Sequence, residues 1–125
     1  MSNDLASKTI RSYRDLIVWQ KSVEMVIAVY RATKKFPSSE QFAITSQVQR
    51  AAVSVPANIA EGYGRNTQKE YAHFLRIAQG SLSELETLLT IAQKISYCSA
   101  QEYSTLEKHA SEVARMLYAL RKSIS

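Results

Sequence analysis

Apolar residues recur at intervals of three and four positions in four separate stretches of the chain. Such spacing places the apolar side chains on one face of an α-helix. The first stretch predicts a helix that begins near Asp15, where a carboxylate suits the positive end of the helix dipole. Phe36 and Pro37 end it, because the residue before a proline is pushed out of helical geometry. Its expected buried face carries Leu16, Trp19, Val23, Val26, Ile27 and Tyr30.

The second stretch predicts a helix from about Glu40 to Tyr63, with Ser39 as its N-terminal cap. Pro56 lies inside this stretch, and a proline within a helix removes one backbone hydrogen bond and crowds the carbonyl four residues earlier. A kink near Ala52–Pro56 is expected rather than a break, because the apolar stripe resumes on the same face. That stripe carries Ile44, Val48, Ala51, Ala52, Val55 and Ile59.

The third and fourth stretches both begin with the pattern of a capping box. In this motif, a hydroxyl and a carboxylate three residues apart each accept a hydrogen bond from the other's backbone N–H. Thr67 and Glu70 open the third stretch, and Ser99 and Glu102 open the fourth. The third stripe is wide, which predicts contact with more than one neighbouring helix. It carries Tyr71, Phe74, Leu75, Ala78, Leu82, Leu85, Leu88, Leu89, Ala92 and Ile95.

The fourth stretch repeats strictly every three and four positions, as in a heptad seam. Short connections between four long helices force neighbouring helices to run antiparallel. The sequence therefore predicts an all-α, antiparallel up-down-up-down four-helix bundle with a proline kink in the second helix. Residues 13–125 are expected to form one domain, and the polar residues 1–12 a mobile tail. The fourth seam carries Tyr103, Leu106, Ala110, Val113, Leu117, Leu120 and Ile124.

The composition favours long helices in a reducing environment. The 125 residues include 3 Gly and 2 Pro, which argues against a turn-rich β protein. The one cysteine, Cys98, leaves no partner for an internal disulfide and suits the cytoplasm. No apolar run reaches the roughly 20 residues of a membrane-spanning helix, and the N-terminal segment does not resemble a signal peptide. A cytoplasmic location without membrane attachment is therefore expected.

No set of residues has the spacing of a catalytic or metal site. Phosphate-cradling glycine loops, paired Cys or His spacings for zinc and a Gly-flanked serine are all missing from the sequence. His73 and His109 are expected to be solvated, since a functional histidine needs an orienting partner. Glu84 and Glu86 are two positions apart and so point to different faces of a helix. The sequence therefore predicts a protein that is not an enzyme, with no catalytic residues, no cofactor and no metal.

Polar residues form a second stripe on the second predicted helix, expected on the side opposite its apolar stripe. They recur every three or four positions and are poor in Lys and Glu. An ordinary solvated face has such a stripe, but hydroxyl and amide side chains also suit a subunit or partner interface. The last two members are one turn apart and can form an ion pair. The polar stripe consists of Gln47, Arg50, Ser54, Asn58, Glu61 and Arg65.

Basic side chains give the chain a formal charge of +5, from 16 Lys plus Arg and 11 Asp plus Glu. This charge suits nucleic-acid binding and also an ordinary basic protein. The predicted topology places the cations of the first and third helices at opposite ends of one bundle. A ring of subunits would repeat each cluster and strengthen its field. The candidate nucleic-acid-binding residues are Lys21, Arg31, Lys34, Lys35, Arg50, Arg65, Lys69 and Arg76.

Three segments resemble the signatures of a known family. Asp15–Lys21 is similar to its opening signature, Thr45–Arg65 to its central signature and Phe74–Thr87 to its third. The family is that of the 23S rRNA intervening-sequence proteins, which are four-helix bundles. The resemblance covers about residues 13–122, and the central segment makes it specific because that segment is long and unusual in composition.

The resemblance implies a bacterial four-helix bundle that is encoded in an insertion within a 23S rRNA gene and often assembles as a ring-shaped homopentamer. The accessory variability determinant protein of diversity-generating retroelements is related to the family and binds nucleic acid and a reverse transcriptase. The resemblance implies no catalytic activity and supplies no residue-level binding map. The expected partners are therefore further copies of the chain, a nucleic acid, and a protein such as a reverse transcriptase.

Two non-enzymatic functions fit these observations. The first is an oligomeric bundle that binds RNA, DNA or a ribonucleoprotein partner through its basic surface. The charge and the resemblance support it, although the sequence contains no recognised reading motif and most of the seven tyrosines are expected in the core. The alternative is a protein–protein interaction scaffold without a direct role at nucleic acid, in which the polar stripe makes the contacts. An enzyme is the least supported function, because no nucleophile, base or metal set is present.

Overall fold

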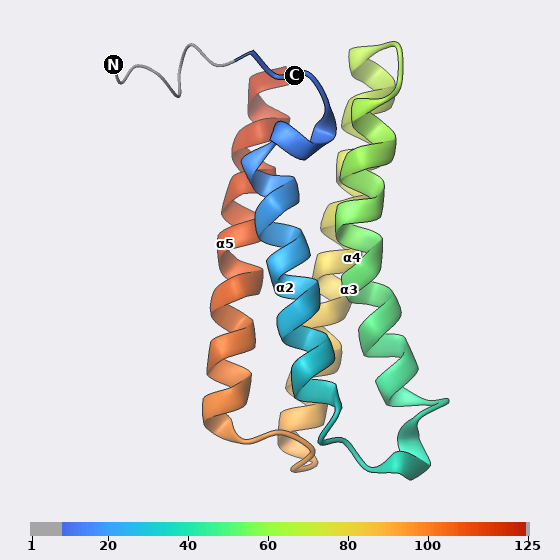
Figure 1. The fold of residues 1–125 in the computed structure, drawn as a ribbon, viewed down its shortest axis with the longest axis vertical. Coiled ribbons are helices and arrows are strands. Elements are labelled where there is room, and N and C mark those ends of the chain that lie inside the picture. Colours follow the sequence, from blue (N-terminus) through green and yellow to red (C-terminus); the bar gives the residue numbers. More distant parts are fainter. Residues whose placement is uncertain (1–8, 125) are drawn as a thin grey trace.

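The computed structural model describes residues 9–124, which form four long helices and two short 3₁₀ helices and contain no strand. Each long helix packs against the next one in the chain, and the last closes the ring against the first. Figure 1 shows that the helices alternate in direction along the long axis. The predicted antiparallel up-down-up-down bundle is therefore confirmed. Its elements are η1 (Tyr13–Asp15), α2 (Ile17–Thr33), η2 (Ser38–Glu40), α3 (Ile44–Tyr63), α4 (Gln68–Lys94) and α5 (Ala100–Ile124).

The expected mobile tail covers residues 1–12, of which residues 1–8 lie outside the described part of the chain. The residues that follow contact the bundle. The Ile10 carbonyl accepts a hydrogen bond from the Tyr63 hydroxyl at 3.4 Å. The backbone N–H of Arg11 donates to the Asp15 carboxylate at 2.8 Å. These two contacts attach the chain to the end of α3 and to η1.

The sequence predicts that the first long helix begins near Asp15, but in the structure Asp15 is the last residue of the short helix η1. Ser12 caps η1 instead, and the Asp15 carboxylate accepts the backbone N–H of Ser12 in a complete capping box. The long helix α2 begins two residues later, at Ile17. The predicted start near Asp15 is thus within two residues of the observed one, and the difference arises because Ser12 supplies a cap upstream that holds Asp15 in a separate 3₁₀ turn.

The buried face of α2 is rotated away from the predicted one, since Ile27 and Tyr30 are 45% and 42% exposed. Two of the residues that replace them in the core are polar. The Ser22 hydroxyl donates to the Trp19 carbonyl at 2.8 Å, and the Thr33 hydroxyl donates to the Tyr30 carbonyl at 3.2 Å. Such bonds to the preceding turn satisfy a small hydroxyl inside a core, so a purely apolar pattern misses it. The buried residues of α2 are Val18, Ser22, Met25, Val29 and Thr33.

The connection between α2 and α3 contains η2, so α3 starts four residues later than expected. Ala43 occupies its cap position and makes no side-chain hydrogen bond there, so the prediction that Ser39 caps this helix is wrong. Glu40 instead accepts a hydrogen bond from the Tyr97 hydroxyl at 2.9 Å. Phe36 is buried against the Tyr97 ring, with the ring centroids 5.8 Å apart. These contacts join the α2–α3 and α4–α5 connections at one end of the bundle.

The helix α3 runs through Pro56 without interruption, and Pro56 is itself buried. The expected continuity is therefore present, and the kink stays a prediction. The predicted apolar stripe is buried at Val48, Ala51, Ala52, Val55 and Ile59, with Ile44 partly buried.

Both predicted helix starts after α3 have their caps. The Thr67 hydroxyl accepts a hydrogen bond from the Glu70 backbone N–H at 3.1 Å. At the start of α5, the Ser99 hydroxyl accepts the Glu102 N–H at 3.0 Å and the Glu102 carboxylate accepts the Ser99 N–H at 2.8 Å. The second pair is a complete capping box.

The apolar stripes of α4 and α5 meet those of α2 and α3 in one continuous core. The predicted seam of α5 is confirmed at Leu106, Ala110, Val113 and Leu117, all of which are buried. In α4 the expected stripe holds except at its end, where Ile95 is exposed. The buried residues of α4 are Leu75, Ala78, Leu82, Leu85, Leu89 and Ala92.

The helices α3 and α4 approach each other closely at Gly62, near the end of α3. A Cβ built on Gly62 would lie 2.8 Å from the Phe74 Cβ and 3.2 Å from the Tyr71 carbonyl oxygen. Both contacts are shorter than ordinary carbon contacts of about 3.5–4.0 Å. A residue without a side chain is therefore required for this spacing of the two helices.

Candidate nucleic-acid interface

Five of the eight cations predicted from the sequence lie at the two ends of the bundle. Arg31, Lys34 and Lys35 lie where the chain passes from α2 to α3. Arg65 and Lys69 lie at the opposite end, where it passes from α3 to α4 (Figure 1). One bundle therefore keeps these two groups apart, as expected.

Acidic neighbours neutralise two of the nominated cations on the α2 side. The Lys21 ammonium lies 3.8 Å from a Glu24 carboxylate oxygen and 3.7 Å from one of Glu112. The Lys35 ammonium lies 2.7 Å from the Glu102 carboxylate. The hydrogen bond in this second pair raises the pKa of Lys35 and lowers the pKa of Glu102, so both groups stay charged. A cation with a carboxylate beside it adds little net field for a phosphate.

Arg65 also has an acidic partner, since its guanidinium lies 2.6 Å from the Glu61 carboxylate one turn earlier. The predicted Glu61–Arg65 pair is thus present. The same guanidinium lies 4.7 Å from the centre of the Phe74 ring, which is a cation–π distance. These contacts hold Arg65 against the start of α4.

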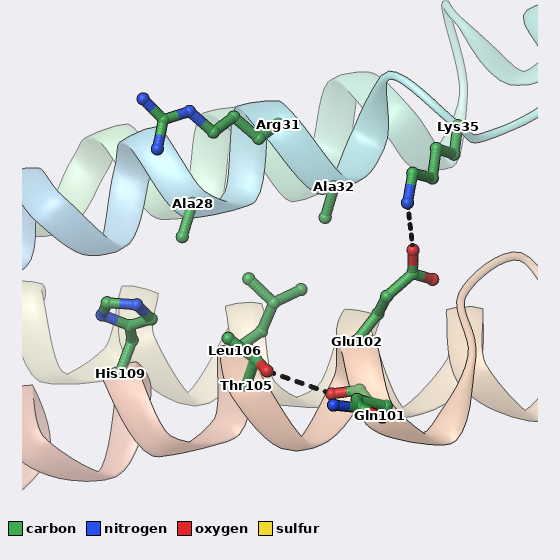
Figure 2. A pocket seen from close by; sticks show the side chains of 9 residues that line it. All are labelled: Ala28, Arg31, Ala32, Lys35, Gln101, Glu102, Thr105, Leu106 and His109. Carbon is green, nitrogen blue, oxygen red and sulfur yellow. Dashed lines mark hydrogen bonds and ion pairs between the residues drawn. The ribbon is translucent and has the colours of Figure 1, made fainter.

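An open groove of about 470 Å³ lies between the end of α2 and the start of α5. Ala28, Ala32 and Leu106 supply apolar lining. Figure 2 shows Lys35 reaching across the groove to Glu102, whereas the Arg31 side chain lies along α2. The groove therefore has an apolar lining and an ion pair at one end, and it does not concentrate unpaired cations.

The middle of the polar stripe faces α4, although the sequence placed the stripe opposite the core. The Ser54 and Ser81 hydroxyls are 2.8 Å apart across the two helices. The Asn58 amide donates to the Ser54 carbonyl at 2.8 Å and to its hydroxyl at 2.9 Å. Both residues are half-buried, while Gln47 and Arg50 at the start of the stripe are exposed. The centre of the stripe is thus a contact within the chain.

The remaining nominated cations are exposed, and one of them joins a cluster that the sequence did not predict. No ion pair within residues 9–124 is made by Arg31, Lys34, Arg50, Lys69 or Arg76. Arg76 borders a hollow of about 190 Å³ between α4 and α5. We call this the cationic hollow, and its lining residues are Ala72, Arg76, Tyr118, Arg121 and Lys122.

The cationic hollow combines three basic side chains from two helices, and no acidic side chain lines it. The Arg121 guanidinium donates to the Gln79 amide oxygen, which fixes it beside α4. The Lys122 ammonium lies 5.7 Å from the centre of the Tyr118 ring. Guanidinium groups attract phosphate, and one arginine can bind two phosphate oxygens at once.

The sequence did not indicate a role for Tyr118, Arg121 and Lys122, because the last turns of α5 carry little of the family signature. The tyrosines were also mostly expected in the core, yet Tyr118 is 57% exposed. The heptad seam contained the signal for Tyr118. Leu117 occupies a seam position and is buried, so the next residue is turned away from the core. The placement of Arg76 around the same hollow as the end of α5 could not be foreseen without the register of α4 against α5.

Other polar groups offer no comparable site. Cys98 is buried, and burial followed by the charge of Glu102 raises the pKa of its thiol. Glu86 on α4 lies near Glu107 on α5, and burial followed by the Glu107 charge raises the pKa of Glu86.

Within residues 9–124, no three His, Cys, Asp or Glu side chains gather where they could hold a metal ion. In the same part of the chain, every helix is too short or too polar to cross a membrane.

The model of the 23S rRNA-intervening sequence protein family matches residues 14–119, which is most of the chain. The chain belongs to this family. A solved structure supports the shared fold: the crystal structure of a protein of unknown function from the S23 ribosomal protein family of Bacteroides thetaiotaomicron. It superposes with a TM-score of 0.77 at 22% identity, over 85% of this chain and 99% of that one. At that identity the likeness shows the fold alone. No curated protein matches the chain.

Membership in the 23S rRNA-intervening sequence protein family agrees with the resemblance seen in the sequence. The matched region starts one residue before Asp15 and ends within α5. It includes Arg76 and Tyr118 but stops before Arg121 and Lys122. The cationic hollow therefore combines family residues with two residues beyond the matched region.

Proposed function

We propose that the chain is a non-enzymatic bundle that binds nucleic acid through the cationic hollow. The observation that carries this proposal is the meeting of Arg76 from α4 and Arg121 from α5 around one hollow without an acidic side chain in its lining. Other nominated cations, such as Lys35 and Arg65, are already paired with carboxylates. Arg76 and Arg121 have no such carboxylate partner within residues 9–124, so their hollow favours added negative charge.

The family supports a link to RNA, because its name refers to a sequence that intervenes in 23S rRNA. Phosphate contacts would supply most of the affinity, since the bundle has no reading motif of a known nucleic-acid-binding fold. Binding is therefore expected to depend weakly on sequence. A bacterial, cytoplasmic setting and a ribonucleoprotein partner such as a reverse transcriptase are consistent with this function.

The functional unit in this proposal is a homo-oligomer, with the pentamer expected from the family resemblance. Apolar side chains at the surface support an assembly: Val53 on α3 and Ile77 on α4 are exposed. Repetition of one cationic hollow per subunit would multiply the phosphate contacts.

The test is a binding titration with nuclease-treated protein and a fluorescein-labelled single-stranded oligonucleotide. Affinity should fall linearly, on logarithmic axes, as NaCl rises from about 50 to 200 mM, because phosphate contacts release counterions. Absence of binding at the lowest salt would overturn the proposal. Light scattering on the same sample measures the assembly, with about 70 kDa expected for a pentamer of 14.1 kDa chains.

A protein-interaction scaffold is the second candidate, and one residue favours it specifically. Phe42, in the connection before α3, is 91% exposed. Aromatic side chains are enriched at protein interfaces, so Phe42 is a natural contact point for a protein partner. Recovery of a partner after nuclease treatment, and its loss with Phe42→Ser, would favour this function. Failure of the salt titration would leave it as the better account.

A further inference from the structure

Arg115 is an exposed cation on α5 that has no part in the proposed site. It makes no ion pair in the described part of the chain. It borders a second hollow, of about 420 Å³, that Tyr103 also lines. The Tyr103 hydroxyl lies 3.0 Å from the Thr90 hydroxyl of α4, so this hollow opens on the side of α5 that is next to α4. Arg115 and the cationic hollow therefore lie on the same side of α5.

The register of α4 against α5 places four cations in a row along this side. The hydrogen bond from Arg121 to the Gln79 amide oxygen brings these two residues to the same level of the antiparallel helices. At about 1.5 Å per residue, Arg115 lies about 9 Å from that level along α5. Lys69 lies about 15 Å from it along α4, in the opposite direction. The end cations are thus about 24 Å apart, and Arg76 and Arg121 lie between them.

The two cations of α4 share one face of the helix, because Lys69 and Arg76 are seven residues apart. The adjacent Glu70 is turned roughly 100° away from Lys69 around the helix. Like Arg115, the two α4 cations are exposed and make no ion pair in the described residues. This side of the bundle therefore presents positive charge over most of the length of a helix.

An acidic side chain marks the end of the row on α5. Glu107 lines the second hollow together with Arg115, and it lies roughly two turns before Arg115 in the helix. Its carboxylate repels a phosphate and offsets the charge of the adjacent Lys108. Lys108 is exposed and occupies the same face of α5 as Arg115, seven residues earlier. The field that attracts phosphate is therefore strong at Arg115 and weak at Lys108.

Resting on the proposed nucleic-acid function, we propose that the cationic hollow is the middle of a longer phosphate track along the α4–α5 contact. Lys69 forms one end of the track and Arg115 the other, and a strand of RNA or DNA lies lengthwise along the two helices. A strand carries one phosphate per about 3.4 Å of helix axis, so a track of about 24 Å matches roughly seven phosphates. Because phosphate contacts carry no sequence information, the track accepts any sequence of sufficient length.

The first experiment is a salt titration with a fluorescein-labelled 12-nucleotide single strand of mixed sequence. Arg115→Gln should reduce the slope of log affinity against log salt by about 0.7, the value of one phosphate contact with a single strand. The matched control Lys108→Gln removes the same charge from the same face of α5 and should keep the wild-type slope. Arg115→Lys should also keep it, because the charge remains. Thermal melting of each variant checks that the bundle is folded.

The second experiment measures the length of the track. Lys69→Gln combined with Arg115→Gln should reduce the slope for the 12-nucleotide strand by about 1.4, because both ends lose a contact. A 4-nucleotide strand spans about 14 Å and leaves at least one end cation without a phosphate. The wild type should therefore bind an 8-nucleotide strand at least about 10-fold more tightly than a 4-nucleotide strand.

Equal slopes for Arg115→Gln and Lys108→Gln would overturn the track, and so would similar wild-type affinities for 4 and 8 nucleotides. Either result leaves the proposed function standing if Arg76→Gln with Arg121→Gln still lowers the slope. Failure of the wild type to bind the 12-nucleotide strand at the lowest salt overturns the proposed function and the track together.

Discussion

Gly62 fixes the distance between α3 and α4, and its role can be separated from ordinary glycine flexibility. Its missing Cβ would lie 2.8 Å from the Phe74 Cβ. Gly80 is also inside a helix, but a Cβ there would meet no atom within 4 Å. The two residues have the same chemistry and the same secondary structure, so they differ in packing alone.

Replacement of these glycines by alanine should therefore change stability in opposite directions. Gly62→Ala is expected to lower the free energy of unfolding by about 1–3 kcal/mol, because the added methyl group overpacks the contact with Phe74. Gly80→Ala is expected to raise it by about 0.5–1 kcal/mol through helix propensity. Urea unfolding at one protein concentration measures both. A Gly62→Ala protein as stable as the wild type would show that α3 and α4 are not held at this distance.

At the scale of the helices, apolar spacing predicted the four long helices well. It predicted less well which residues of each helix face the neighbouring helices. The seam of α5 and its capping box at Ser99 were predictable because each depends on neighbours in the sequence. The rotation of α2 was not predictable, because Ser22 and Thr33 are buried although their side chains are polar. The contact of Ser54 with Ser81 was not predictable either, because it depends on how α3 and α4 pack.

The α4–α5 contact carries a pH dependence that sequence spacing could not reveal. One carboxylate oxygen of Glu107 is buried without a hydrogen-bond partner. Glu86 faces it and has a raised pKa, mainly through burial and then through the charge of Glu107. A protonated Glu86 can donate to the Glu107 oxygen, whereas two ionised carboxylates repel each other. The protonated form of Glu86 is therefore favoured in the folded state.

This pair should contribute stability at low pH and lose it as pH rises. The folded-state pKa of Glu86 lies above its unfolded value, so the folded state binds the proton more tightly. The contribution is complete below the unfolded pKa of about 4.3 and disappears as pH rises through the folded pKa. Urea unfolding across this range should show a pH-dependent loss in the wild type that is absent in Glu86→Gln. Glu84→Gln, on the exposed side of α4, is the control, and equal pH slopes for the wild type and Glu86→Gln would contradict the account.

For the whole molecule, the distribution of charge decides more than its total. The formal charge of +5 is divided between ends of the bundle, and several cations are paired with carboxylates. The sequence could supply the eight candidate cations but not their partners. Arg76 alone among them belongs to the cationic hollow, and the fold adds Arg121 and Lys122 from the far end of the chain. The tertiary structure thus makes a site from residues that lie about 45 positions apart in the sequence.

The most direct measurement of the central claim is the salt dependence of single-strand binding for two double variants of equal charge. Arg76→Gln with Arg121→Gln removes two cations from the hollow, and Lys94→Gln with Lys108→Gln removes two exposed cations elsewhere. The first variant should reduce the slope of log affinity against log salt by about 1.4, at roughly 0.7 per phosphate contact. The second should keep the wild-type slope. Equal slopes in the two variants would contradict a localised site and would leave only diffuse attraction by net charge.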